Sequence, residues 1–246
     1  MLFLYKLFII IFFIILFIYL FNLSTQDTNL NNYNPNYLVL DENNVNKHTN
    51  DNNLFISDPN YSIKEFPNFL SYEVCDRIVK LSKNILEKSQ VYSGNINKYD
   101  DKHRSSYHGW LDDSNVYIYN ISKDVAKLTN TDIDKQEALQ VVKYNSGGFF
   151  NNHYDPCVGN KEFCKRMTDQ YDGNDRLYTF IIYLNDDYTG GETIFPIINK
   201  VIKPEKGKAV LFQNIDHNGK IIKEALHRGS EIKSGTKYLC NKWIHL

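Results

Sequence analysis

Short segments rich in β-branched and aromatic residues, separated by glycine-containing turns, fill the second half of this chain and restrict its fold. Strand-like segments cover residues 139–144, 177–184, 192–195, 209–212 and 237–244. The clearest are LQVVKY, which precedes the turn Asn145-Ser146-Gly147-Gly148, and LYTFIIYL. Residues of this kind favour strands, and glycine turns between short strands are typical of a β-sandwich or a small barrel.

Two amphipathic helices are expected before these strands. Residues 71–89 form the first behind a Ser71 cap, and residues 114–128 form the second, because apolar side chains recur there at helical spacing. Their apolar faces consist of Val74, Ile78, Leu81 and Ile85 in the first helix and of Tyr117, Ile121, Val125 and Leu128 in the second. We therefore predict a mainly β domain with flanking helices, of the α+β class.

The first 23 residues, MLFLYKLFIIIFFIILFIYLFNL, are almost wholly apolar. A helix of about 20 such residues is long enough to cross a membrane. A cleaved signal peptide would have a shorter apolar stretch followed by small residues, so we expect an uncleaved transmembrane signal anchor over residues 1–23. Lys6 is the only basic residue before Lys47. The positive-inside rule therefore places the N-terminus in the cytosol and the rest in a lumen, that of the endoplasmic reticulum.

Residues 24–58 are dominated by Asn, Asp and Thr and show no sustained hydrophobic period. This composition predicts a flexible Asn-rich stalk, followed by a globular domain over residues 59–246. The formal net charge of −1 and the lack of a basic stripe argue against a nucleic-acid partner. Nothing in the sequence defines an oligomeric state.

A luminal location allows disulfide bonds between the four cysteines. Cys157 and Cys164 flank a polar loop and are able to close a small ring, and Cys75 and Cys240 form a second possible pair. Buried free thiols are the alternative, whereas zinc binding is disfavoured because no Cys-x-x-Cys pair occurs. Two sequons are potential glycosylation sites, Asn60-Tyr61-Ser62 and Asn120-Ile121-Ser122.

A possible metal site is formed by His153-Tyr154-Asp155 and by His227, which lies 72 residues after Asp155. Side chains two apart in a strand share one face, so His153 and Asp155 are able to bind one ion. A histidine from a neighbouring strand would complete a facial set of two imidazoles and one carboxylate, which suits non-haem iron(II). A His-x-Asp pair alone is weak evidence, since both side chains are equally able to be solvated near a turn.

Three further residues indicate an anion beside this metal site. Lys237 lies ten residues after His227 within an expected strand, and a lysine buried there needs an anionic partner. A dicarboxylic cosubstrate that chelates iron at its keto-acid end would offer its far carboxylate to Lys237. The hydroxyl groups of Tyr144 and Thr179 are candidates for hydrogen bonds to the same carboxylate.

From about residue 66 onward, the chain resembles the catalytic domain of prolyl 4-hydroxylases. The resemblance is carried by RSSYHGWL (104–111), LQVVKYNSGGFFNNHYD (139–155), RLYTFIIYLND (176–186), GGETIFP (190–196), KGKAVLF (206–212), LHRGSEIKSGTK (226–237) and NKWIH (241–245). It implies a double-stranded β-helix, or jelly roll, that binds Fe(II) through His153, Asp155 and His227 and holds 2-oxoglutarate with Lys237, Tyr144 and Thr179. It also implies that Trp243 and His245 lie near the substrate-binding mouth.

The activity that this resemblance implies is hydroxylation of proline in peptide or protein substrates, with O2 as cosubstrate and L-ascorbate as reductant. The chain is similar to the short plant, algal and viral forms, which lack a separate peptide-binding domain. It departs from the family at Arg228-Gly229-Ser230, where relatives often carry a proline. Lysine or a small molecule is an alternative substrate for the same chemistry. A membrane-anchored jelly-roll binding protein without catalysis is another alternative, but all four of the implied catalytic residues, His153, Asp155, His227 and Lys237, are present.

Overall fold

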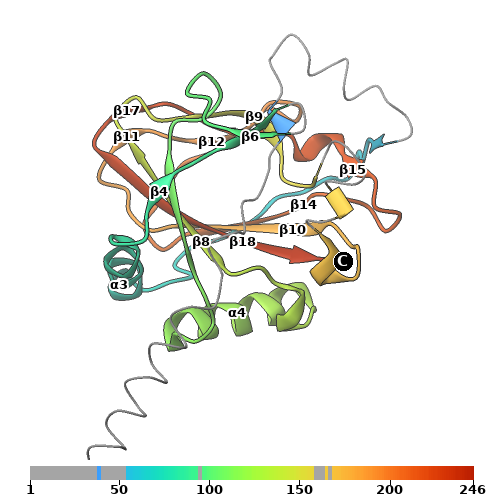
Figure 1. Cartoon of the computed structure of the whole chain (residues 1–246), viewed down its shortest axis with the longest axis horizontal. Coiled ribbons are helices and arrows are strands. Elements are labelled where there is room, and N and C mark those ends of the chain that lie inside the picture. Colours follow the sequence, from blue (N-terminus) through green and yellow to red (C-terminus); the bar gives the residue numbers. More distant parts are fainter. Residues whose placement is uncertain (1–37, 40–53, 94–95, 158–163, 166–167) are drawn as a thin grey trace, which may run out of the picture. The chain divides into compact units, whose positions relative to one another are not determined.

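The computed structural model describes residues 38–39, 54–93, 96–157, 164–165 and 168–246 (Figure 1). The expected membrane anchor at residues 1–23 and most of the expected stalk lie outside these ranges. Within the described ranges, no helix combines the length and the apolar character needed to span a bilayer.

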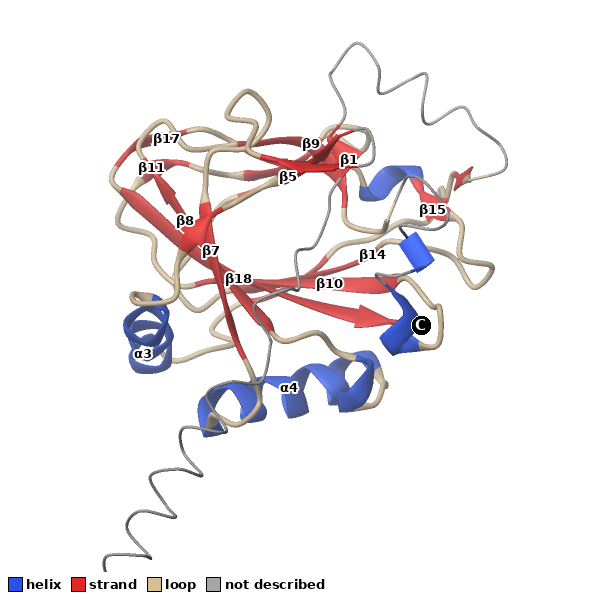
Figure 2. Cartoon of the chain, in the orientation of Figure 1, coloured by secondary structure: helices blue, strands red, loops and turns tan. Residues whose placement is uncertain are grey.

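Two seven-stranded sheets form the described domain (Figure 2). In spatial order, the first sheet consists of β13 (Lys200–Ile202), β12 (Thr193–Phe195), β16 (His227–Gly229), β9 (Phe150–Tyr154), β1 (Leu38–Val39), β5 (Val91–Ser93) and β6 (Ile96–Lys98). The second consists of β3 (Lys64–Phe66), β14 (Ala209–Gln213), β10 (Arg176–Tyr183), β18 (Thr236–His245), β8 (Leu139–Asn145), β7 (Tyr107–Leu111) and β4 (Glu87–Lys88). Neighbouring strands are antiparallel except β1 and β5.

Smaller elements complete the domain. Two further two-stranded sheets pair β11 (Thr189–Gly190) with β17 (Ile232–Ser234) and β15 (Ile221–Ile222) with β2 (Phe55–Ile56). The short 3-10 helices are η2 (Ile133–Lys135), η3 (Asp169–Tyr171) and η4 (Lys223–Ala225). The mainly β class with few helices agrees with the expected jelly-roll domain.

Alternation along the strands of the second sheet separates two hydrophobic cores. In β10, Ile181 and Tyr183 belong to one core cluster, whereas Phe180 and Ile182 belong to the other. The first cluster also contains Phe150, Tyr154 and Phe195 from the first sheet, so it fills the space between the sheets. The second cluster contains residues of both helices, so it lies on the outer face of the second sheet. A strand covered on both faces is apolar at nearly every position, which explains why Thr179 is the one small polar residue in the LYTFIIYL run.

The two helices cover the outer face of the second sheet (Figure 2). Helix α3 (Tyr72–Ser82) begins behind Ser71, whose hydroxyl accepts from the Val74 N–H at 3.3 Å, as expected. It ends seven residues earlier than expected because the chain turns into β4, which pairs with β7. Helix α4 (Val116–Thr129) begins behind Asn115 and agrees closely with the expected helix at 114–128.

The folded domain begins before the expected boundary at residue 59. Phe55 in β2 is only 4% exposed, and its ring lies 5.2 Å from that of Tyr154. Ser57 donates to the Glu224 carboxylate at 2.5 Å, which joins this segment to η4 just before His227. Parallel pairing with β15 and burial of Phe55 therefore make residues 54–58 part of the fold rather than of a stalk. Further upstream, β1 pairs with β9 beside His153.

Candidate metal site and adjoining pocket

Two neighbouring strands of the first sheet bring His153, Asp155 and His227 together. His153 of β9 and His227 of β16 are directly opposite in the antiparallel register, and Asp155 follows the end of β9. One ligand atom from each of the three lies within 4.8 Å of the others. All three side chains are buried, with 3–5% exposure. A slip of one residue in this register would turn His227 to the other face, so strand pairing itself defines the cluster.

Backbone carbonyl groups determine which nitrogen of each imidazole is available to a metal. His153 Nδ1 lies 2.8 Å from the Asn151 carbonyl oxygen, and His227 Nδ1 lies 3.0 Å from that of Ala225. A carbonyl oxygen only accepts, so each Nδ1 carries the proton and donates. The Nε2 lone pairs are then directed into the cluster, as in metal sites whose outer contacts orient the ligands. Burial, with a contribution from His153, lowers the pKa of His227 to about 4, which keeps that ring neutral near pH 7.

Asp155 is the anionic member of the cluster. Burial alone raises the pKa of this carboxyl, but His227 and His153 beside it outweigh burial and hold the pKa well below its usual value. Thr179 donates to Asp155 Oδ2 at 2.5 Å, and Asn214 Nδ2 donates in turn to the Thr179 hydroxyl at 2.8 Å. Two imidazole Nε2 atoms and one oriented carboxylate are therefore available to a single divalent cation.

A buried ion pair supports the backbone of Asp155. Arg176 binds Glu137 through two hydrogen bonds of 2.6 and 2.9 Å, and it donates to the Asp155 carbonyl oxygen at 3.0 Å. Its guanidinium lies 3.7 Å from the ring centroid of Trp243. His245 Nε2 approaches Glu137 at 2.8 Å, so Glu137 joins these residues in one network. Despite complete burial, Arg176 and His245 lower the pKa of Glu137 to about 2.

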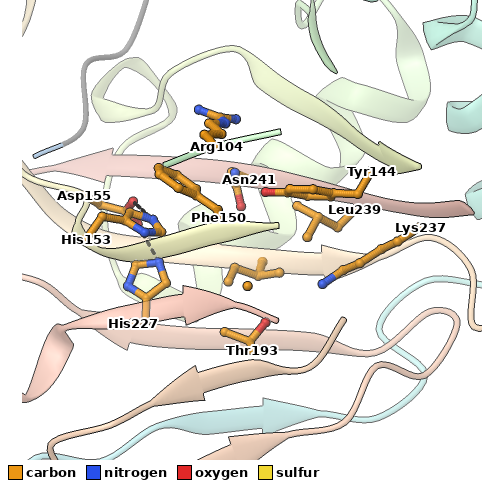
Figure 3. Close-up of a pocket in the computed structure, with 12 residues that line it drawn as sticks. Arg104, Tyr144, Phe150, His153, Asp155, Thr193, His227, Lys237, Leu239 and Asn241 are labelled. Carbon is orange, nitrogen blue, oxygen red and sulfur yellow. Dashed lines mark ion pairs between the residues drawn. The ribbon is translucent and has the colours of Figure 1, made fainter. Parts of the chain in front are cut away.

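A pocket that is partly open to solvent adjoins the cluster. Figure 3 shows the cluster at one end of this pocket and Lys237 pointing toward it from the other. The lining residues are Arg104, Tyr144, Phe150, His153, Asp155, Ile181, Thr193, His227, Gly229, Lys237, Leu239 and Asn241. The pocket therefore joins a metal-binding arrangement to a buried cation.

Lys237 is 2% exposed and directly opposite Tyr144 in the pairing of β18 with β8. Its ammonium donates to the carbonyl oxygen of Gly191 at 2.5 Å, and within the described residues it forms no ion pair with a carboxylate. Burial lowers the pKa of Lys237 to about 7, an effect that the charge of Glu192 partly offsets. A buried ammonium with two further N–H groups fits a carboxylate ligand.

Comparisons with known proteins agree with this arrangement. The family model described as the 2OG-Fe(II) oxygenase superfamily matches residues 139–245. This range includes His153, Asp155, His227 and Lys237. A putative prolyl 4-hydroxylase of Acanthamoeba polyphaga mimivirus is 30% identical over 190 residues, which cover 77% of this chain and 76% of the relative. The chain belongs to the prolyl 4-hydroxylase family of 2OG-Fe(II) oxygenases.

Other relatives match a similar share of the chain. Probable prolyl 4-hydroxylase 3 of Arabidopsis thaliana is 30% identical, and the match covers 74% of this chain and 68% of the relative. Among solved structures, the viral collagen prolyl hydroxylase of Paramecium bursaria Chlorella virus-1 in its 2OG complex is 28% identical, with a TM-score of 0.59. That match covers 77% of this chain and 98% of the viral chain.

The predicted cosubstrate residues do not all meet at one place. Tyr144 lines the pocket opposite Lys237, as expected. Thr179 does not line it and is directly opposite Trp243 in the pairing of β10 with β18. Trp243 lies six positions after Lys237 in the same strand, a distance of about 20 Å. The prediction that Thr179 helps to hold the far carboxylate is therefore wrong, and its hydroxyl instead contacts Asp155.

Trp243 and His245 are buried beside the pocket rather than part of its lining. Both are expected near the substrate mouth, but they are 0% and 2% exposed, and neither lines the pocket. His245 is enclosed by Glu137, by the Asn174 carbonyl oxygen and by the Tyr171 ring, whose centroid lies 3.7 Å away. In this structure both side chains belong to the network behind Asp155 rather than to an open mouth.

Several residues of the pocket were not predicted from the sequence. Thr193 of β12 lines it, and its hydroxyl pairs with that of Tyr183 at 2.7 Å. Leu239 and Asn241 lie on the same face of β18 as Lys237, because the three residues are two positions apart. This spacing is visible in the sequence. Arg104 follows no such pattern, because it lies outside the named strands in a single β-bridge to Phe150.

The cysteines adopt one of the expected arrangements. Cys157 and Cys164 form a disulfide with a Cα–Cα distance of 5.5 Å. Cys75 and Cys240 are buried free thiols, so the possible second disulfide is not formed. Cys157 also donates its backbone N–H to Asp175 at 2.8 Å, which fixes the chain two residues after Asp155.

Proposed function

We propose that the protein hydroxylates prolyl residues in peptide or protein substrates and couples this to conversion of 2-oxoglutarate and O2 to succinate and CO2. The observation that carries the proposal is one pocket that contains the His153, Asp155 and His227 cluster at one end and Lys237 at the other. The named prolyl 4-hydroxylases among its relatives support proline as the substrate residue.

In this proposal, His153, Asp155 and His227 hold Fe(II) through two Nε2 atoms and one carboxylate oxygen. Lys237 binds the far carboxylate of 2-oxoglutarate through N–H groups that are not used by Gly191. When bound, iron, 2-oxoglutarate and O2 supply the oxidative decarboxylation and the oxygen atom inserted into a C–H bond. The donor set fits this role because two imidazoles and a single carboxylate leave other coordination positions for the cosubstrates.

The remaining pocket residues orient the ligands and exclude water. Tyr144 presents its phenol beside Lys237, and Thr193 presents a hydroxyl from the facing sheet. Burial raises the pKa of Tyr144, so this phenol stays protonated and remains a donor at neutral pH. Ile181 and Leu239 form apolar walls, which strengthen the electrostatic contacts inside the pocket.

Two alternatives use the same residues differently. The iron chemistry is indifferent to which C–H bond is presented, so lysine or a small molecule is the alternative substrate. A non-catalytic binding protein is disfavoured because His153, Asp155 and His227 are all present at one end of a pocket that has the buried Lys237 at its other end. Both alternatives are distinguished by the assay below.

We further propose that the N-terminal apolar segment anchors the enzyme to a membrane, with a cytosolic N-terminus and the catalytic domain in the lumen of the endoplasmic reticulum. The Cys157–Cys164 disulfide supports an oxidising compartment. A luminal domain would be glycosylated at Asn60, which is exposed in a turn, rather than at Asn120, whose sequon includes the fully buried Ser122 of α4. Ascorbate would act as the reductant that returns oxidised iron to Fe(II).

The test measures succinate release and peptide hydroxylation by the full chain in detergent, with Fe(II), ascorbate and 2-oxoglutarate. His153→Ala is the blank, and proline-rich, collagen-like and lysine peptides are compared. Succinate that rises with a proline peptide, together with a mass gain of one oxygen on proline, is the expected result. Stimulation by lysine alone would transfer the activity to the alternative substrate. An absence of both succinate and iron binding would support the non-catalytic alternative.

A further inference from the structure

Four buried polar side chains between the pocket and the surface form a continuous chain of hydrogen bonds. Arg104, Ser106 and His108 lie on the segment that leads from the bridge with Phe150 into β7, and Ser89 follows β4. Each is only 2–3% exposed. Two backbone contacts fix this arrangement, because the Ser89 N–H donates to the Ser106 carbonyl oxygen at 2.9 Å and β4 pairs with β7.

The hydrogen bonds of this chain run in one direction. Arg104 Nε donates to the Ser106 hydroxyl at 2.8 Å, since a guanidinium has no acceptor. Ser106 donates to the Ser89 hydroxyl at 2.9 Å, and Ser89 lies 3.2 Å from His108 Nδ1. When Ser89 donates to Nδ1, the imidazole proton lies on Nε2.

At the surface end of this series of hydrogen bonds, Glu87 favours the same tautomer of His108. Its Nε2 lies 3.6 Å from the Glu87 carboxylate, which attracts an Nε2–H group. Burial and the charge of Arg104 lower the pKa of His108 to about 3, so the ring is a neutral acceptor throughout the neutral range. His108 therefore does not change its charge near neutral pH, and it is the last acceptor in the series of hydrogen bonds that begins at Arg104.

The other end of this series of hydrogen bonds, at Arg104, lies in the pocket. The Arg104 guanidinium carbon is 4.6 Å from the Phe150 ring centroid, and the Phe150 ring stacks on that of His153 with centroids 3.6 Å apart. Figure 3 shows Arg104 and Phe150 on the same side of the pocket as His153. The orientation of the guanidinium therefore determines where its other N–H groups point near His153, Asp155 and His227.

A prolyl peptide makes a guanidinium a suitable partner. The amide before proline has no N–H, so this part of the substrate offers carbonyl oxygens, which only accept hydrogen bonds. Arginine supplies donors in a rigid plane, and its usefulness depends on the direction of that plane. Buried polar groups that orient a neighbouring functional group commonly alter affinity or activity when removed.

We propose that Ser89 and His108 are positioning residues that fix the Arg104 guanidinium, so that Arg104 presents donors to the carbonyl oxygens of the bound peptide. The inference rests on the proposed function, because it assigns a device for peptide binding to the same pocket. His108 acts on Arg104 through Ser89 and Ser106 and does not touch the substrate.

The test compares His108→Leu, which removes the acceptor, with His108→Asn, whose side-chain oxygen takes the place of Nδ1. His217→Leu is the matched control, because His217 is exposed in a distant segment of the sequence. The full chain is assayed for its KM values with a proline peptide and with the keto-acid cosubstrate. Binding of a labelled peptide is measured separately without O2, with Mn(II) in place of iron, and the Tm of each variant is recorded.

We expect His108→Leu to raise both KM and Kd for the peptide about 10-fold, the lower end of the range for outer contacts of a site. The KM for the keto-acid cosubstrate should change less than about twofold, and His108→Asn should restore peptide binding. Ser89→Ala should reproduce the loss if His108→Leu fails to fold. Unchanged peptide binding in His108→Leu and Ser89→Ala would overturn the proposal. A loss that affects both ligands equally, without rescue by Asn, would reduce His108 to a structural residue. A wild-type chain that hydroxylates no proline peptide would instead contradict the proposed function.

Discussion

The burial of Lys237 predicts that 2-oxoglutarate binding weakens as the pH rises through neutrality. Only the protonated amine attracts the far carboxylate, and burial places the pKa of Lys237 near 7 in the ligand-free protein. The protonated fraction then falls from about 0.9 at pH 6 to about 0.1 at pH 8, so the Kd should rise about 10-fold between these values. The sign follows because a depressed lysine pKa leaves less of the binding form at higher pH.

The groups that face Lys237 do not reverse this prediction. The charge of Glu192 raises the pKa of Lys237, so Glu192→Gln should move the loss of binding to lower pH. Tyr144 and Tyr183 lie 5.7 and 5.4 Å from the ammonium, measured to their ring centroids. Burial raises the pKa of both phenols, so they stay neutral from pH 6 to 8.

The assay is calorimetric titration of the full chain with 2-oxoglutarate at pH 6, 7 and 8. Mn(II) replaces iron, the metal is kept saturating at each pH, and O2 is excluded. Lys237→Arg is the matched variant, because arginine stays protonated over this range and should give a Kd that is independent of pH. A flat wild-type profile, or an equal slope in Lys237→Arg, would refute the reasoning.

Three further predictions concern the surroundings of the site. Thr179→Val removes the donor to Asp155 and should weaken metal binding about 10- to 100-fold in a metal titration; an unchanged Kd would remove Thr179 from the metal site. Glu137→Gln breaks the buried pair with Arg176 and should lower the free energy of unfolding by about 3–5 kcal/mol in urea denaturation, whereas less than about 1 kcal/mol would show that the pair is dispensable. Under oxidising conditions, Cys157→Ser should lower the free energy of unfolding by about 2–3 kcal/mol relative to the wild type, and under reducing conditions the two proteins should be equally stable. An equal loss of stability in both conditions would contradict a stabilising disulfide.

The local elements could be predicted from the sequence because each depends on a short period or a cap. Ser71 begins α3, and the apolar run at 177–184 becomes most of the interior strand β10. The spacing of His153 and Asp155 led correctly to a cluster with His227. The seven-residue separation of Cys157 and Cys164 allowed the disulfide that forms between them but did not select it over free thiols.

The positions along the pocket could not be predicted, because they depend on strand register. Thr179 and Thr193 are both strand threonines, and no local pattern shows that only Thr193 reaches the pocket. The pairing of Thr179 with Trp243 decides this, and it results from contacts between distant segments. Burial of Trp243 likewise depends on the guanidinium of Arg176, which lies 67 positions earlier in the sequence.

The central place of β18 in its sheet has a consequence for how the protein folds. β18 lies between β8 and β10, although both precede it in the sequence, and it supplies Lys237. During synthesis, β8 and β10 leave the ribosome long before the strand that joins them, and their inner edges have no partner until it arrives. Closing such long loops is entropically slow, so the nascent domain exposes two strand edges that favour aggregation. Chaperones that shield unpaired strands should therefore increase the yield of active enzyme more than a lower temperature alone.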